Sequence, residues 1–300
     1  MNIVSKLFLA TRPAFLTITL LGCLLGIALP STNKESLLIN ILGLGVALFM
    51  HAAANLLNDY FDHLNGSDQN NAGCIAPFTG GSRFIQNQLL KPAQILQLAI
   101  TLILLGVAIG LYICSQTTWL LIPLGLIGVG IAWSYSAPPL ELMSRGVLGE
   151  LAISIAWALI VIGFACIQIH SIAYEAIPLG LTYGLMVSNI LLVNQIPDID
   201  ADRLANKMTL ATQTTNHALS HWYISIFIAA YTFQIAGIYM NLIPQGTAAA
   251  FLVMPIFIYC SRGIAQRGNK KWKIKKLIVH NLIAIHLHSL LLLTGLLIHT

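Results

Sequence analysis

Charged residues are scarce in this chain of 300 residues: only 8% are Asp, Glu, Lys or Arg, whereas 57% are hydrophobic. A soluble domain carries roughly 25% charged residues, so the composition excludes an ordinary soluble protein. Apolar runs of about 20 residues, the length that crosses a bilayer as a helix, recur along the whole sequence. We therefore expect a polytopic membrane protein with a single domain over residues 1–300, embedded in the lipid bilayer.

Paired cysteines are also missing. The five cysteines stand singly and none forms a CxxC pair, so neither a zinc knuckle nor a disulfide framework is indicated. The first apolar run lacks a small-residue cleavage site and further apolar runs follow it, so we expect no cleavable signal peptide. The net charge of +5 could indicate nucleic-acid binding, but the basic residues follow the predicted membrane topology instead. We expect no nucleic-acid partner.

The apolar runs predict an all-α integral membrane protein with nine transmembrane helices. We place these helices near residues 14–30, 36–57, 93–114, 118–134, 147–169, 173–195, 219–241, 246–261 and 277–298. Lys and Arg gather in cytoplasmic loops. With the N-terminus in the cytoplasm, every one of the 15 basic residues except Lys34 falls on the cytoplasmic side. The sequence thus predicts a multi-pass protein of the inner (plasma) membrane, with its N-terminus cytoplasmic and its C-terminus external.

Acidic residues number only ten, and six of them fall in two short segments. The first segment, residues 55–68, contains Asp59, Asp62 and Asp68, and the second, residues 194–203, contains Asp198, Asp200 and Asp202. Carboxylates at membrane depth are costly and persist where a cation or a reaction needs them. Each segment closes a predicted helix at the cytoplasmic face, so we expect the active site on that side.

The spacing within both segments places oxygen atoms on one helix face. Asn58 and Asp62 are four residues apart, as are Asp198 and Asp202, and residues at this spacing share a face. Asp and Asn oxygens suit Mg²⁺, which keeps some waters and bridges to substrate phosphates. We expect these four residues to bind Mg²⁺ together with a diphosphate. The alternative is that they only solvate helix ends, but two such motifs on one side argue against it.

Basic residues in the flanking loops could complete a diphosphate site. A diphosphate needs cations besides Mg²⁺, and Arg binds phosphate oxygens bidentately. The candidates are Arg83, Arg145, Arg203 and Lys207, although each could instead be a positive-inside anchor. Glycines at 80 and 81 would let the backbone approach a phosphate closely. The basic run Lys270–Lys276 is better explained as a binding surface for lipid headgroups.

Together the two motifs resemble those of the UbiA superfamily of intramembrane prenyltransferases, which carry NDxxDxxxD and DxxxD on a nine-helix fold. Asn58-Asp59-Tyr60-Phe61-Asp62 matches the opening of the first motif, and Asp198-x-x-x-Asp202 matches the second. Gly66 stands where the first motif should end in Asp, and Asp68 follows two residues later. This arrangement, followed by Pro-Phe-Thr-Gly-Gly-Ser at 77–82, resembles the menaquinone branch, which prenylates 1,4-dihydroxy-2-naphthoate.

The resemblance implies a reaction and its participants. A polyprenyl diphosphate and an aromatic acceptor would be the substrates, with Mg²⁺ assisting departure of the diphosphate and the aromatic ring attacking the allylic cation. It also implies a set of catalytic residues. We expect these to be Asp59, Asp62, Asp68, Tyr135 and Arg145. Another acceptor, such as 4-hydroxybenzoate or homogentisate, is an alternative. From a different class, an ion-coupled membrane transporter would instead place its acidic groups near the bilayer midplane.

Overall fold

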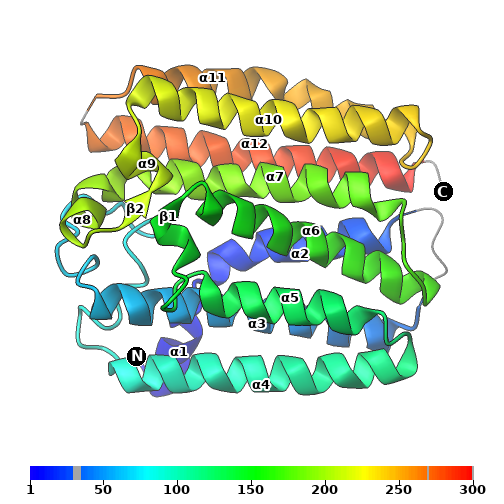
Figure 1. Cartoon of the computed structure of the whole chain (residues 1–300), viewed down its shortest axis with the longest axis horizontal. Coiled ribbons are helices and arrows are strands. Elements are labelled where there is room, and N and C mark those ends of the chain that lie inside the picture. Colours follow the sequence, from blue (N-terminus) through cyan, green and yellow to red (C-terminus); the bar gives the residue numbers. More distant parts are fainter. Residues whose placement is uncertain (30–34, 269, 299–300) are drawn as a thin grey trace.

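The computed structural model describes residues 1–29, 35–268 and 270–298. The long helices run side by side along the longest axis of the molecule (Figure 1). In chain order the α-helices are α1 (Ile3–Ala10), α2 (Leu16–Ile27), α3 (Leu37–Leu64), α4 (Pro92–Gln116), α5 (Leu121–Ser134), α6 (Leu148–Ile169), α7 (Ala176–Asn194), α8 (Ile199–Leu204), α9 (Leu210–Gln213), α10 (Asn216–Tyr239), α11 (Met254–Ala265) and α12 (Lys271–Leu297). Short 3₁₀ helices cover Pro13–Phe15, Leu142–Ser144, Ile196–Asp198 and Gln245–Val253.

Local sequence signals mark where several helices begin. The Ser36 side chain accepts a hydrogen bond from the Ile39 N–H at the start of α3, and Thr215 does the same for Ala218 at the start of α10. These caps satisfy backbone donors that the first helical turn leaves free. Pro92 opens α4, where its missing N–H is no loss. Capping side chains and a proline next to the apolar runs therefore mark where these three helices begin.

Helix α7 is the most enclosed of the long helices. In the span Ala176–Leu204, which includes α7, 78% of the most apolar 18-residue segment is buried inside the protein. The corresponding share for α4 is 22%. Its neighbour α6 approaches so closely that a Cβ added at Gly184 would lie 2.0 Å from the Ser154 carbonyl oxygen. Tyr183 donates a hydrogen bond to the Ile18 carbonyl oxygen of α2. The core thus lies around α7, and α4 presents most of its apolar surface outward.

The prediction of nine transmembrane helices is wrong. Among the described residues seven helices are long and apolar enough to cross a membrane, or eight if the bent pair Ile3–Ala10 and Pro13–Ile27 is one span. Helix α5 has only 14 residues, about 21 Å of helix, which is shorter than the roughly 30 Å hydrocarbon core. Helix α2 qualifies only together with α1, from which it is bent by 43°. Lys34, predicted to be external, lies outside the described residues.

The two acidic motifs lie at the same end of the bundle, as the sequence predicts. Helix α3 ends at this end, and α8, α9 and the loop that follows α3 gather there (Figure 1, left). A parallel two-stranded pairing of β1 (Arg145–Gly146) with β2 (Met208–Thr209) joins the loop after α5 to the loop after α8. Segments far apart in the sequence therefore meet at one end of the molecule.

Candidate active site

A cavity of about 520 Å³ begins between the two acidic motifs and continues along the bundle. At the motif end its wall includes Asp62, Asp68, Asp198 and Asp202. It reaches Gly43, near the first turns of α3, as well as Ile113 of α4 and Ile167 of α6, which lie near the other end of their helices. The cavity is therefore polar at one end and mostly apolar along its length.

The first motif reaches the cavity because α3 continues through it to Leu64. Asn58 and Asp62 share one face of the helix, and the Asn58 Nδ2 donates to Asp62 Oδ2 over 2.9 Å. The helix then stops, and Gly66 has a φ of +82°, a conformation that glycine adopts at little cost. The chain turns back at this point, and Asp68 reaches the cavity from the loop.

The second motif reaches the cavity through a break at the end of α7. Pro197 lies in the 3₁₀ helix Ile196–Asp198 that separates α7 from α8, and proline interrupts the hydrogen bonding of an α-helix. Asp198 and Asp202 line the cavity. Asp200, which lies between them in sequence, is exposed and does not line it.

Lys207 connects the two motifs electrostatically. Its Nζ lies 2.9 Å from Asp62 Oδ1 and 3.4 Å from Asp202 Oδ1, and the residue is only 4% exposed. Burial by itself would lower the pKa of Lys207, but the two carboxylates outweigh burial and raise that pKa. The ammonium therefore stays charged and holds together carboxylates that would otherwise repel each other.

Arg12 is a second, partly buried cation at the cavity, and it was not among the site residues expected from the sequence. It forms an ion pair with Asp59, and its Nη2 donates to Asn58 Oδ1 over 3.1 Å. Asp59 also accepts the Ser82 backbone N–H at 3.1 Å. Asp59 does not itself line the cavity, whereas Arg12 does. In the sequence, Pro13 directly after Arg12 indicates a break in the first span, but it does not show that the arginine reaches the site.

The loop after α3 covers the second motif. The Asn71 Nδ2 donates to Asp198 Oδ1 over 2.8 Å, and the Gly80 N–H donates to Asp198 Oδ2 over 3.3 Å.

A Cβ at Gly81 would lie 2.6 Å from Asp68 Oδ2, so only glycine lets the backbone come this close. Burial, and then the neighbouring Asp62 and Asp59 carboxylates, raise the pKa of Asp68 to about 8.

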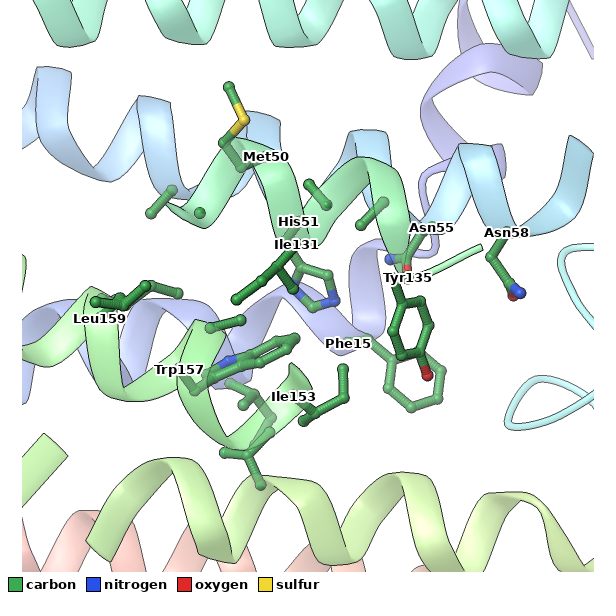
Figure 2. A pocket seen from close by; sticks show the side chains of 18 of the residues that line it. Phe15, Met50, His51, Asn55, Asn58, Ile131, Tyr135, Ile153, Trp157 and Leu159 are labelled. Carbon is green, nitrogen blue, oxygen red and sulfur yellow. The ribbon is translucent and has the colours of Figure 1, made fainter. Parts of the chain in front are cut away.

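Three of the four predicted diphosphate-binding cations do not line the cavity. The guanidinium groups of Arg83, Arg145 and Arg203 donate to the backbone carbonyl oxygens of Asp68, Pro139 and Thr212, and none of the three arginines is among the described residues that line the cavity. Lys207 does line it, as does the predicted catalytic residue Tyr135 (Figure 2). Their roles in the reaction stay predictions.

The donor atoms at the motif end fit a Mg²⁺ that shares its ligands with a phosphate. Within the described residues no three His, Cys, Asp or Glu side chains converge on a metal position, so the protein alone does not enclose one. However, Asn71 Oδ1 and Asn194 Oδ1 are buried without a hydrogen-bond partner in the described part of the chain, and both residues line the cavity. Mg²⁺ commonly takes one or two carboxylates together with substrate phosphates and waters.

A membrane helix bundle with a carboxylate-rich cavity mouth and an apolar interior suits a substrate with an anionic head and a long apolar tail. Comparison with known families agrees with this description. Residues 19–283 match the UbiA prenyltransferase family, so the chain belongs to that family and is a transferase of prenyl groups. The predicted family and enzyme class are confirmed, and the transporter alternative is set aside. The prediction of a single domain over residues 1–300 stays a prediction.

Individual relatives support the same assignment. The 1,4-dihydroxy-2-naphthoate octaprenyltransferase of Bacillus subtilis (strain 168) is 29% identical over 259 residues, which are 85% of this chain and 81% of that protein. A structure of digeranylgeranylglyceryl phosphate synthase superposes with a TM-score of 0.70 at 16% identity, covering 99% of both chains. The structure of a UbiA homologue from Archaeoglobus fulgidus bound to DMAPP and Mg²⁺ superposes with a TM-score of 0.64 at 13% identity. The superposition covers 96% of this chain and 99% of the other. The all-α membrane fold is thereby confirmed.

Proposed function

We propose that this protein transfers a prenyl group from a polyprenyl diphosphate to 1,4-dihydroxy-2-naphthoate in a Mg²⁺-dependent reaction. The observation that carries the proposal is the cavity, which joins both acidic motifs at one end and is apolar beyond them. The similarity to the Bacillus subtilis octaprenyltransferase supports the naphthoate as the acceptor. The Gly66 and Asp68 arrangement in the first motif supports the same acceptor by resemblance.

The motif end would hold the diphosphate. Asn58, Asp62, Asp198 and Asp202 would hold the metal, and bound there Mg²⁺ would neutralise charge that develops on the departing diphosphate. Lys207 supplies a positive charge between the two motifs. Arg12, the other cation at the cavity, lies beside Asn58. These cations would favour the leaving group because Lys207 is buried and Arg12 is partly buried, and charge interactions there are less screened than in water.

The bond changes balance without an added reagent. The C1–oxygen bond of the prenyl diphosphate breaks and the diphosphate leaves with the electron pair. The ring carbon that bears the carboxylate forms the new bond to C1. Loss of that carboxylate as carbon dioxide returns an electron pair to the ring and restores its aromaticity. Exclusion of water by the apolar cavity protects the allylic cation.

The apolar length of the cavity would hold the prenyl tail. A Cβ added at Gly110 of α4, or at Gly125 or Gly128 of α5, would meet no atom within 4 Å. All three glycines line the cavity. The missing side chains leave room between these helices for an isoprenoid chain, which extends away from the motif end as the cavity does.

A competition assay tests the choice of acceptor. Purified protein in lipid would receive one polyprenyl diphosphate, Mg²⁺ and equal amounts of 1,4-dihydroxy-2-naphthoate, 4-hydroxybenzoate and homogentisate, with products identified by mass. We expect the prenylated naphthalenediol, lighter by one carbon dioxide than the simple adduct. Exclusive prenylation of 4-hydroxybenzoate would overturn the acceptor assignment.

A further inference from the structure

One stretch of the cavity wall is polar and aromatic, yet it lies beyond the acidic motifs. Figure 2 shows His51 and Trp157 beside each other there, with Tyr135 and Phe15 closer to Asn55 and Asn58. All of these residues line the cavity. The diphosphate and metal chemistry described above uses none of His51, Trp157 and Phe15, so this part of the wall needs its own explanation.

His51 lies on the face of α3 that also carries the first motif. Positions 51, 55, 58 and 62 follow the three- and four-residue spacing of one helix face, and all four residues line the cavity. His51 and Asp62 are eleven positions apart on the helix, about 16 Å along its axis. The imidazole is therefore well beyond the diphosphate end, among apolar side chains such as Ile131 and Ile153 (Figure 2).

Two contacts fix the imidazole in place. Its Nδ1 lies 2.7 Å from Thr19 Oγ1 on α2, and its ring meets Trp157 of α6 edge to face, with centroids 5.0 Å apart and an interplanar angle of 84°. Edge-to-face packing is a preferred arrangement of aromatic rings. Three helices thus hold one polar ring in a defined orientation at the cavity.

The other ring nitrogen of His51, Nε2, makes no hydrogen bond within the described part of the chain, and His51 is only partly buried on the cavity wall, so Nε2 is open to a ligand there. The Trp157 Nε1 is buried without a partner among the described residues. Nε2 can serve in either tautomer: it is a donor when Thr19 donates to Nδ1, and an acceptor when Nδ1 carries the proton. A polar group of a ligand would satisfy it.

The prenyl tail offers no such group, because it is a hydrocarbon. An aromatic acceptor with hydroxyl and carboxylate oxygens does. Asn58 is seven positions from His51 on the helix, about 10 Å along its axis, and Tyr135 and Phe15 also line the cavity. A ring placed here would face aromatic side chains and lie next to the motif end, where C1 of the prenyl diphosphate must be. The glycine-lined space of α4 and α5 would remain free for the tail.

We propose that His51 is a binding residue for the aromatic acceptor, with its Nε2 hydrogen-bonded to an oxygen substituent of the acceptor ring. Thr19 fixes the orientation of the imidazole, and Trp157 supports it from α6. The proposal deepens the proposed function and rests on it, since it names which part of the cavity receives the second substrate.

Steady-state kinetics of four variants test this assignment. We expect His51→Leu to raise the KM for the acceptor about tenfold, which corresponds to the loss of about 1.4 kcal/mol of binding, and to change the KM for the prenyl diphosphate less than twofold. His51→Gln should recover part of the loss, because its amide can hydrogen-bond. Thr19→Val should give a smaller increase in acceptor KM. The control is His280→Leu, since His280 is outside the cavity on α12, and it should match wild type.

A binding measurement provides a readout that is independent of turnover. The Kd of the acceptor would be measured in the presence of Mg²⁺ and a non-reactive prenyl diphosphate analogue, and it should rise about as much as the KM in His51→Leu. An acceptor KM and Kd within twofold of wild type would overturn the role of His51, as would equal increases for both substrates. If His51→Leu does not fold, an unchanged acceptor KM in Thr19→Val overturns the proposal.

Failure of the proposed function would look different. In that case wild-type protein forms no naphthoate product, and the same variants are measured with whichever aromatic acceptor wild type prenylates. A selective increase in KM for that acceptor still supports His51 as an acceptor-binding residue, and no increase overturns it.

Discussion

Lys207 shows how single side chains organise this site. The carboxylates that it contacts, Asp62 and Asp202, come from different helices, and its buried ammonium lies within 3.4 Å of both. Two carboxylates this close to one another would repel without an intervening cation. The cation therefore preserves the geometry of the motif end and contributes positive charge where a diphosphate would lie.

The three aspartates of the second motif provide an internal comparison. Asp198 and Asp202 line the cavity, whereas Asp200 is exposed. We expect Asp198→Asn and Asp202→Asn each to lower the prenyl transfer rate by about 100-fold or more, a loss typical of removing one group that stabilises the transition state. Asp200→Asn makes the same chemical change two residues away and should keep a near-normal rate. Equal losses in all three variants would show that charge in this segment matters, but not its position.

Sequence spacing predicted the acidic residues that line the cavity, but of the four predicted cations only Lys207 lines it. Four-residue spacing places the oxygen-bearing side chains of each motif on one side of the chain. The structure brings the four residues Asn58, Asp62, Asp198 and Asp202 to one cavity. No such periodicity governs loops, and the side chains of Arg83, Arg145 and Arg203 contact nearby backbone carbonyl groups instead. Arg12 enters the site through the bend before α2, a tertiary feature that no local pattern specifies.

Close packing of α6 against α7 keeps the motif-bearing helix in position. A Cβ added at Gly184 would lie 2.0 Å from the Ser154 carbonyl oxygen of α6, whereas one added at Gly163 of α6 would meet nothing within 4 Å. Overpacking a core by one methyl group typically costs about 1–3 kcal/mol. Since α7 leads directly into the second motif, this contact affects both stability and the site.

These two glycines allow a matched test of that contact. We expect Gly184→Ala to lower the melting temperature of the detergent-solubilised protein by several degrees, because the helices must separate. Gly163→Ala should leave the melting temperature unchanged or raise it slightly, because alanine favours helix. A Gly184→Ala variant as stable as wild type would mean that α6 and α7 are not packed this tightly.

Helix positions were easier to predict than the number of spans. Each of the nine apolar runs contains a helix in the structure, but within residues 1–29, 35–268 and 270–298 only seven helices, or eight with the bent pair, are long enough to cross the membrane. The difference arises at α5 and α2. The apolar runs at 118–134 and 14–30 extend beyond the ends of these helices, because apolar residues such as Phe15 also occur in turns and breaks. Composition alone does not reveal where a helix stops.

At the scale of the whole molecule, charge distribution predicts orientation. The basic run Lys270–Lys276 lies at the start of α12, at the same end of the bundle as α8 and the acidic motifs (Figure 1). Basic residues favour the cytoplasmic side of a membrane protein. We therefore expect the motif end to face the cytoplasm, so that the diphosphate substrate enters from that side.

Single cysteines at the two ends of the bundle would test the orientation. Lys273 is exposed near the start of α12, and Ser115 is exposed near the end of α4. A membrane-impermeant maleimide should label Ser115→Cys in intact cells and Lys273→Cys only after permeabilisation. The parent protein gives the background, since four of its five cysteines are buried. Labelling of Lys273→Cys in intact cells would reverse the proposed orientation.

Metal dependence tests the central claim most directly, because the account places a diphosphate on oxygen ligands from both acidic motifs. Prenyl transfer to the naphthoate would be followed in purified protein with excess EDTA, and then after Mg²⁺ is added back beyond the chelator. We expect no detectable product in EDTA and full recovery with Mg²⁺. Undiminished turnover in excess EDTA would contradict the assignment of the two motifs as a Mg²⁺–diphosphate site.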